Sequence, residues 1–193
     1  MQFDLPAALE SRLSRLPDNL NAHIARVRDI ARGLAGVHQI DIELADLVAA
    51  AHDVARHLQG RQLIEEAERL NIPVGPLERF APIVLHGPVG AAWLRAEDVL
   101  QSADQFEAVY WHTSAHPDLA PVGKLVFVAD KIDPAKAKAH PFQDSVRKAV
   151  RNSLDEGVLA FLDGVIKEHV DHKRLVHPMS IEARNRLITE MAC

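Results

Sequence analysis

The chain has 193 residues, which is long enough for one well-packed core but short for two. Its 48% hydrophobic and 25% charged residues are typical of a soluble globular protein. The formal net charge of -5 argues against a nucleic-acid binder, which normally carries a basic face. An anionic substrate stays possible, because a bound cation can supply positive charge locally.

The cysteine and apolar content narrow the class further. The single cysteine is Cys193, so the sequence has no internal disulfide framework and no cysteine-based metal site. The opening MQFDLPAALE has no apolar signal core, and no apolar run approaches membrane-spanning length. We therefore expect a cytoplasmic protein that binds neither membrane nor nucleic acid.

Helical periodicity recurs along the whole chain and is interrupted at prolines and glycines. The expected helices cover residues 6–16, 18–36 with Asp18 or Asn19 as the cap, 41–58 with Asp41 as the cap, 61–71, a helix that begins at the Gly87-Pro88 step, 105–113, 121–133, 142–150, 154–170 and 180–192 with Ser180 as the cap. No segment alternates convincingly like a strand. The fold is predicted to be all-α, and the apolar run LADLVAAA should make the third helix central.

A histidine followed directly by an aspartate, His52-Asp53, stands at the polar end of that third helix. Imidazole nitrogen and carboxylate oxygen are good ligands for transition-metal ions, and an aspartate has two oxygens with which to bridge two ions. Similar side chains occur near other helix ends or Pro/Gly breaks, namely His23, His86, His112 and Asp130. An unpaired carboxylate is costly to bury, so Asp130 needs a cation if it points inward.

Each of these residues also has a simpler explanation. A single histidine at a helix end is more often a cap or a surface residue than a ligand. Asp130 could instead pair with Lys124 or Lys131. The order along the chain, which is His, His-Asp, His, His and Asp on successive helices, is what favours a metal site.

That order resembles the ligand order of the HD-domain metal phosphohydrolases. More narrowly, the chain is similar to their YqeK-like branch, the symmetrical diadenosine tetraphosphatases, over about residues 20–187. The similarity also rests on LHGPVGA at 85–91, KLVFVADKIDP at 124–134 and RLVHPMSIEARN at 174–185. It implies one domain over residues 1–193, with a metal-binding core at about 18–135, a metal site between helices, and C-terminal helices 141–193 packed onto the core.

The resemblance also implies the cofactor and the reaction. Two divalent ions would be held, the first by His23, His52, Asp53 and Asp130, and the second by Asp53, His86 and His112, with Asp53 as the bridge. Nitrogen and carboxylate ligands without thiolate suit iron or manganese, and the branch implies iron. The implied enzyme uses metal-activated water to cleave diadenosine tetraphosphate into two ADP, with His52, Asp53 and Arg56 as catalytic residues.

Residues expected to bind the substrate are Arg56, Lys136, His116 and Gly87. Arg56 lies one helical turn after Asp53 and should project on the same side, although a plain surface cation is the simpler interpretation. Lys136 occupies the place of a phosphate-binding residue, or is a solvated lysine in AKAKAH. The chain departs from the branch after His112, where a T-x-G-R-P-G-M type loop is replaced by HTSAHPDLA and its arginine by His116. It departs again before the first ligand, with Asn21-Ala22 in place of an arginine.

Other functions stay open. The chain could be an HD phosphohydrolase for nucleoside mono- or triphosphates, or a non-catalytic regulatory domain that binds a nucleotide, although the latter predicts missing ligands. A purely structural bundle or a helix-turn-helix DNA binder fits less well. The family also leads us to expect a homodimer. The remaining histidines are interpreted as surface or cap positions, namely His38, His57, His140, His169 and His172, whereas His177, before Pro178, is expected to position the C-terminal helix.

Overall fold

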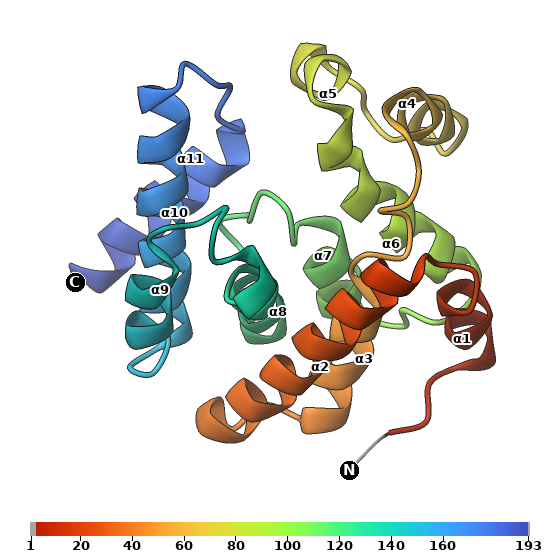
Figure 1. Cartoon of the computed structure of the whole chain (residues 1–193), viewed down its shortest axis with the longest axis horizontal. Helices are drawn as coiled ribbons and strands as arrows, with labels where there is room; N and C mark the ends of the chain where they lie inside the picture. Colours follow the sequence, from red (N-terminus) through yellow and green to blue (C-terminus); the bar gives the residue numbers. More distant parts are fainter. Residues whose placement is uncertain (1–2, 193) are drawn as a thin grey trace.

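The computed structural model describes residues 3–192, which form eleven α-helices and two 3-10 helices and contain no strand. The α-helices are α1 (Ala7–Leu13), α2 (Asp18–His38), α3 (Ile42–Ala51), α4 (Gly60–Arg69), α5 (Pro76–Phe80), α6 (His86–Ala96), α7 (Ala103–Tyr110), α8 (Pro121–Lys131), α9 (Gln143–Ala149), α10 (Leu154–Asp171) and α11 (Pro178–Met191). The 3-10 helices are η1 (Pro82–Leu85) and η2 (Pro134–Lys136). The all-α prediction is confirmed (Figure 1).

Helix α8 lies at the centre of the bundle and contacts α2, α3, α7 and α10 (Figure 1). Pro121 begins it, at a position where the missing N–H has no partner to lose. Nine of its residues are buried, because the apolar run LVFVA leaves almost no polar face. Phe127 packs edge-on against Phe161 of α10, with ring centroids 5.4 Å apart. The C-terminal end of α8, which carries Asp130, is therefore held inside the molecule.

Helices α2 and α3 form an antiparallel pair beside α8, and α3 is buried as predicted. The connection turns through Gln39, which has the left-handed φ of 56°, and the predicted cap Asp41 accepts hydrogen bonds from the first turn of α3. Asp46, which is fully buried, receives Arg28 and Arg32 of α2. This ion-pair group fixes α2 against α3, and with it the relative positions of the histidines that they carry.

Several predicted helix boundaries were wrong. The third helix ends at Ala51 and not near residue 58, because residues 52–57 form turns. The cap expected from Asp18 or Asn19 is absent, since Pro17 precedes α2 and provides no side-chain cap. The last helix begins at Pro178 with His177 as its cap, while Ser180 lies inside the helix.

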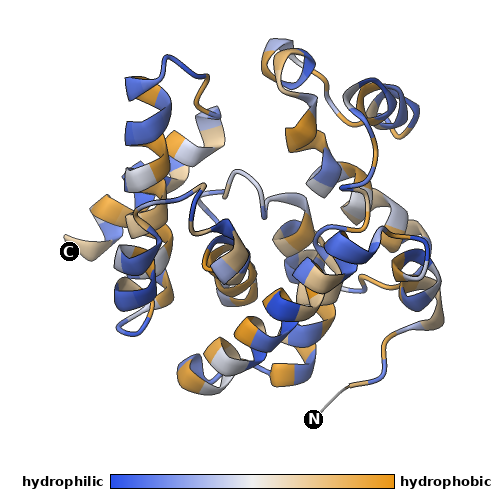
Figure 2. Ribbon diagram, viewed as in Figure 1, coloured by the Kyte–Doolittle hydropathy of each residue, from blue (hydrophilic) through white to orange (hydrophobic). Residues whose placement is uncertain are grey.

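Helices α4 to α6 and helices α9 to α11 lie on two sides of this central group (Figure 1). Most helices carry both hydrophilic and hydrophobic residues, as amphipathic packing requires (Figure 2). Helix α10 contacts α8, α9 and α11, and the Ser180 hydroxyl of α11 donates to the carbonyl of Ser114 at 2.6 Å. Among the described residues, no helix is long and apolar enough to cross a membrane.

Candidate metal centre

Three of the predicted ligand histidines follow a helical turn and bond back to it. In each, ring nitrogen Nδ1 lies close to the carbonyl oxygen three residues earlier. The bonds run from His52 to Ala49 at 2.7 Å, from His112 to Val109 at 2.7 Å, and from His86 to Ile83. The last carbonyls of a helix lack an intrahelical donor, so these rings satisfy them. The capping role and the ligand role of these histidines are thus compatible.

This capping fixes the tautomer of each ring. A carbonyl oxygen can only accept, so Nδ1 carries the proton and the neutral ring presents a lone pair at Nε2. His23 reaches the same state by another route, because its Nδ1 is 2.7 Å from Oδ2 of Asp133. The four rings consequently direct unprotonated Nε2 atoms into one buried space.

The first group of converging atoms comes from α2, the turn after α3, and α8. Nε2 of His23 lies 3.0 Å from Oδ1 of Asp130 and 3.4 Å from Nε2 of His52. Nε2 of His52 lies 3.6 Å from the same Asp130 oxygen. All three side chains are buried, and together they could hold one metal ion.

The second group is completed by Asp53. Nε2 of His86 lies 2.9 Å from Nε2 of His112 and 2.9 Å from Oδ1 of Asp53. The other oxygen of Asp53, Oδ2, faces the first group at 3.5 Å from Nε2 of both His23 and His52. Asp53 therefore stands between the groups and presents one oxygen to each, as a bridging ligand would.

Cations fit this arrangement. In the neutral form of each ring, the Nε2 lone pairs and the carboxylate oxygens meet at distances of 2.9–3.6 Å. Such a concentration of buried acceptors is unfavourable unless positive charge lies among them. The donors are imidazole nitrogen and carboxylate oxygen without thiolate, which suits a divalent transition ion. The six predicted ligands are thus brought together as two adjoining sets of metal-binding type.

Burial lowers the pKa of His52, but the Asp53 and Asp130 carboxylates outweigh it and raise that pKa. The pKa values of Asp53 and His112 agree directly with a ligand role. Burial raises the pKa of Asp53, but His52, His112 and His86 outweigh it and hold that pKa well below its usual range. Burial lowers the pKa of His112 to about 3. Both groups are therefore in their metal-binding forms, carboxylate and neutral imidazole, at neutral pH.

Two lysines accompany Asp130. Nζ of Lys131 lies 2.7 Å from Oδ2 of Asp130 and donates to the carbonyl of His112 at 3.1 Å, and Lys136 pairs with Oδ1 of Asp130. Despite burial, these two cations keep the pKa of Asp130 well below its usual range. The simpler interpretation, a pair with Lys131, is correct, but it coexists with the ligand geometry. Lys124 pairs instead with Asp155 at 2.5 Å.

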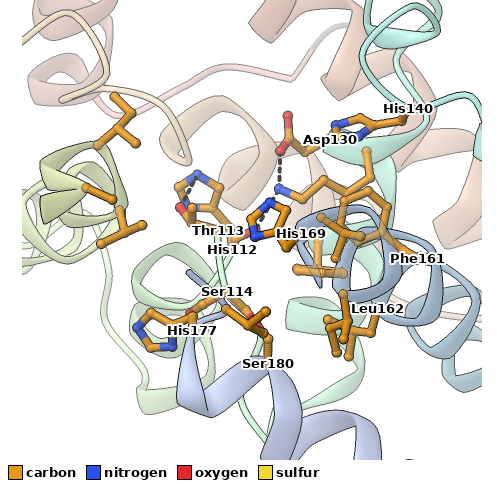
Figure 3. A pocket seen from close by; sticks show the side chains of 18 of the residues that line it. His112, Thr113, Ser114, Asp130, His140, Phe161, Leu162, His169, His177 and Ser180 are labelled. Carbon is orange, nitrogen blue, oxygen red and sulfur yellow. Dashed lines mark hydrogen bonds and ion pairs between the residues drawn. The ribbon is translucent and has the colours of Figure 1, made fainter. Parts of the chain in front are cut away.

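A cavity of about 450 Å³ opens beside the two groups (Figure 3). Its polar lining consists of metal-binding side chains and the cations of Arg56, Lys131 and Lys136. Its apolar lining comes largely from α10 and the α10–α11 connection, which contribute Phe161, Leu162, Val165, Ile166, Leu175 and Val176. The cavity can therefore accept a ligand with an anionic part and an apolar part.

The structure brings two of the four predicted substrate-binding residues, Arg56 and Lys136, to this cavity. His116 is not among the lining residues. Its ring stacks on Trp111 with centroids 4.8 Å apart, and its Nδ1 accepts from the amide of Asp118 at 3.2 Å. The loop after His112 thus turns this histidine toward the protein and leaves the cavity without the cation expected there.

Gly87 is also absent from the cavity lining and has a packing environment. A Cβ atom at this position would lie 2.7 Å from the carbonyl oxygen of Tyr110 and 3.1 Å from Nδ1 of His112. The missing side chain allows α6 to approach the end of α7. That close approach is what brings His86 and His112 together.

Sequence reasoning missed four residues near the site. His140 and His169, interpreted as surface or cap positions, and His177, expected to position the C-terminal helix, line the cavity, and His177 does cap α11 as well. These three histidines reach the cavity only through the packing of the C-terminal part of the chain, so the sequence pattern gave no indication of their position. The Asp133-Pro134 step was interpreted only as a helix end, so Asp133 was not predicted as a site residue.

The comparisons with known proteins agree with this geometry. The family model described as HD domain matches residues 21–135, more than half of the chain. The chain is 24% identical over 183 residues to a protein of Halalkalibacterium halodurans and 26% identical over 182 residues to one of Bacillus subtilis, both named symmetrical bis(5'-nucleosyl)-tetraphosphatase. These matches cover 95% and 94% of this chain, and 96% of each relative.

A solved structure is also similar. It is the 1.50 Å crystal structure of a predicted HD superfamily hydrolase involved in NAD metabolism from Clostridium acetobutylicum. It superimposes with a TM-score of 0.88 at 27% identity, over 97% of this chain and 100% of that chain. With the ligand order, the two converging groups and the matched family model all in agreement, this chain belongs to the HD domain family.

Proposed function

We propose that the protein is a metal-dependent phosphohydrolase that cleaves diadenosine tetraphosphate symmetrically into two ADP. The observation that carries the proposal is the position of Asp53 between two ligand groups, at the wall of a cavity lined by both cationic and apolar side chains. The names of the relatives from H. halodurans and B. subtilis support the same reaction. Helix α10 and the α10–α11 connection extend the apolar wall beyond the matched HD segment.

The metal requirement is proposed as two divalent ions. His23, His52, Asp53 and Asp130 would hold the first, and Asp53, His86 and His112 the second. Iron is our choice and manganese the alternative, because both accept imidazole and carboxylate ligands. Two such ions, when bound, lower the pKa of a water molecule and offset the charge of phosphate oxygens.

The side chains of this chain would orient the substrate. Arg56 is exposed, lines the cavity and makes no ion pair or side-chain hydrogen bond with the described residues, so its guanidinium is available for phosphate. Lys136 lies beside Asp130 and can contact the same phosphate chain. The apolar wall around Phe161 would hold one adenosine and exclude water from it. These residues position the central anhydride bond near Asp53.

The decisive experiment is product analysis. Protein purified without oxygen and loaded with iron(II) or manganese(II) is incubated with diadenosine tetraphosphate, and the nucleotides are separated by ion-exchange chromatography. One water molecule is consumed per substrate, so ADP should be the sole product at two per substrate. In water enriched in oxygen-18, one heavy oxygen should enter one of the two ADP molecules.

Two histidines close in the chain give a matched pair of variants. His52→Ala removes a ligand from the first group and should abolish cleavage. His57→Ala changes an exposed ring outside both groups and should leave cleavage intact. Formation of ATP and AMP would reject cleavage at the central anhydride, and equal activity of the two variants would reject the metal centre.

A second candidate function has one specific observation in its favour. The ring of His116 stacks on Trp111, so the cavity lacks one cation that a long phosphate chain would use. A shorter substrate, a nucleoside mono- or triphosphate, fits that lower positive charge. Turnover of these nucleotides without turnover of diadenosine tetraphosphate, under the same metal loading, would favour this alternative. The presence of all six ligands argues against a non-catalytic regulatory domain.

The proposal includes a cytoplasmic protein that acts on a small nucleotide and not on nucleic acid or membranes. It also includes a homodimer, which the resemblance to the branch implies. Light scattering coupled to size-exclusion chromatography measures the molar mass directly. A mass equal to one chain across the working concentration range would refute the dimer.

A further inference from the structure

His23 differs from the other ligand histidines in how its ring is held. It lies inside α2, near the start of the helix, where the carbonyl three residues earlier is already used by the helix's own backbone hydrogen bonds. Its Nδ1 is instead 2.7 Å from Oδ2 of Asp133, a residue 110 positions further along the chain. The orientation of this ring therefore depends on a contact between distant segments.

Asp133 is fully buried and its two oxygens are fully engaged. Oδ1 accepts from Nε of Arg26 at 2.8 Å and from the amide of Ala135 at 3.1 Å. Oδ2 accepts from the second arm of the same guanidinium at 2.9 Å and faces the His23 ring. Arg26 lies one turn after His23 on α2, so the carboxylate joins two neighbouring positions of that helix to the segment after α8.

The backbone around Asp133 is clamped from outside the matched HD segment. The Gln143 side chain of α9 donates to the carbonyls of Lys131 and Asp133, each at 2.8 Å. Arg147 donates to the carbonyl between them, that of Ile132, at 2.7 Å. Three successive carbonyls after Asp130 are thus satisfied by α9, which leaves the Asp133 carboxylate little freedom to move.

We propose that Asp133 is a positioning residue for the first metal group: it fixes the tautomer and the orientation of His23 so that Nε2 stays free to bind metal. Carboxylates that accept from a ligand histidine act in this way in metal sites generally. The second group, Asp53, His86 and His112, has no contact with Asp133 and does not depend on it. The inference rests on the metal centre of the proposed function but not on its substrate.

Asp133→Asn tests the proposal with almost no change in shape. Asn can keep one oxygen where Arg26 Nε and the Ala135 amide both donate. Its amide group then occupies the place of Oδ2, loses the hydrogen bond from Nη2 of Arg26 and donates to Nδ1 of His23, which moves the ring proton to Nε2. The matched control is Asp46→Asn, which alters another buried carboxylate bound by two arginines of α2 but touches no ligand.

The readout is metal binding in the absence of substrate. Metal-free protein is titrated with iron(II) or manganese(II) against a competing chelator, and bound ions per chain are counted. Asp133→Asn should bind one ion as the wild type does and the other about 10–100-fold more weakly. Asp46→Asn should bind both ions normally while melting at a lower temperature. Normal affinity for both ions in Asp133→Asn, or an equal loss in Asp46→Asn, overturns the proposal.

A second readout reports the tautomer itself. Nitrogen-15 NMR of histidine-labelled, metal-free protein should give the Nδ1–H form for His23 in the wild type and the Nε2–H form in Asp133→Asn. An Nε2–H ring in the wild type, or no change in the variant, overturns the proposal. Arg26→Gln, at a half-exposed side chain, is the second variant and should weaken the same ion to a smaller extent.

These outcomes separate the inference from the proposed function. Selective loss of one ion in Asp133→Asn, in a protein that does not cleave diadenosine tetraphosphate, supports the positioning role and rejects the substrate. Cleavage by the wild type, with both ions bound normally by Asp133→Asn, rejects the positioning role alone.

Discussion

Replacing Gly87 by alanine should destabilise the protein and disturb one ligand group. Gly87 is the second residue of α6 and has an ordinary negative φ, so alanine costs nothing in backbone conformation. Its added methyl would lie 2.7 Å from the carbonyl oxygen of Tyr110, 3.0 Å from that of Val109 and 3.1 Å from Nδ1 of His112. Two of these three atoms are backbone and cannot rotate away. The third belongs to the ring whose hydrogen bond to Val109 the methyl would obstruct.

The loss of stability expected for Gly87→Ala is the difference between two opposing contributions. Overpacking of this kind costs about 1–3 kcal/mol, and the better helix propensity of alanine returns about 0.5–1 kcal/mol. The net loss of roughly 1–2 kcal/mol should lower the melting temperature by about 2–8 °C in a chain of this length. Gly33→Ala in α2 is the control, because nothing lies within 4 Å of its Cβ position. It should raise the melting temperature by about 1–4 °C.

Calorimetry measures the melting temperatures of both variants, and the metal ions bound per chain are counted in parallel. The strain lies at His112, so Gly87→Ala should also weaken the ion held by Asp53, His86 and His112. A Gly87→Ala protein that melts at or above the wild-type temperature and binds both ions normally would refute the packing interpretation. It would return Gly87 to the role first expected of it, contact with the substrate.

Three further predictions concern the cavity, the metal and the α2–α3 pair. Arg56→Ala should lower kcat/KM for diadenosine tetraphosphate about 10–100-fold, since a hydrogen bond to a charged group contributes about 1.5–3 kcal/mol. The melting temperature should stay unchanged, and a kcat/KM equal to that of the wild type would refute the phosphate contact. Removing metal with a chelator should lower the melting temperature, because ions at about 100 times their Kd stabilise by about 2.7 kcal/mol; an unchanged melting curve would contradict buried metal ligands. Asp46→Ala leaves the partly buried Arg28 and Arg32 without their carboxylate partner and should lower the free energy of unfolding, measured by urea denaturation, by about 3 kcal/mol. A loss below about 1 kcal/mol would mean that these ion pairs contribute little to stability.

The sequence predicted which side chains converge better than it predicted the helix ends. Order along the chain identified His23, His52 and Asp130 as partners because residue type and placement at helix ends survive small errors in boundary. The end of α3 was misplaced for a physical reason. The apolar period continues past Ala51, but the ring of His52 captures the carbonyl of Ala49, and the chain then leaves the helix. Side-chain competition of this kind has no signature in hydrophobic periodicity.

The substrate-binding residues were harder to predict, because they depend on tertiary packing. Arg56 was expected on the same side as Asp53 from its spacing of three residues, and it does line the cavity, although residues 52–57 form turns and not the expected helix. The position of His116 could not be predicted, since its stacking on Trp111 is decided by the path of an irregular loop. Asp133 was missed because its contact is also tertiary: its partner His23 is 110 residues away, and no local pattern connects them.

The three histidines that close helical turns also have a consequence for the dynamics of the centre. A ring that leaves its carbonyl frees the last turn to fray, and a turn that frays carries its ring away from the metal. Ion dissociation and local opening of the backbone are then one event. Amide protons at the ends of α3 and α7 should exchange with solvent faster whenever the centre is empty, and bound metal should slow them by the free energy with which it is held. Hydrogen exchange at two helix ends would in this way report the occupancy of a centre that is itself buried.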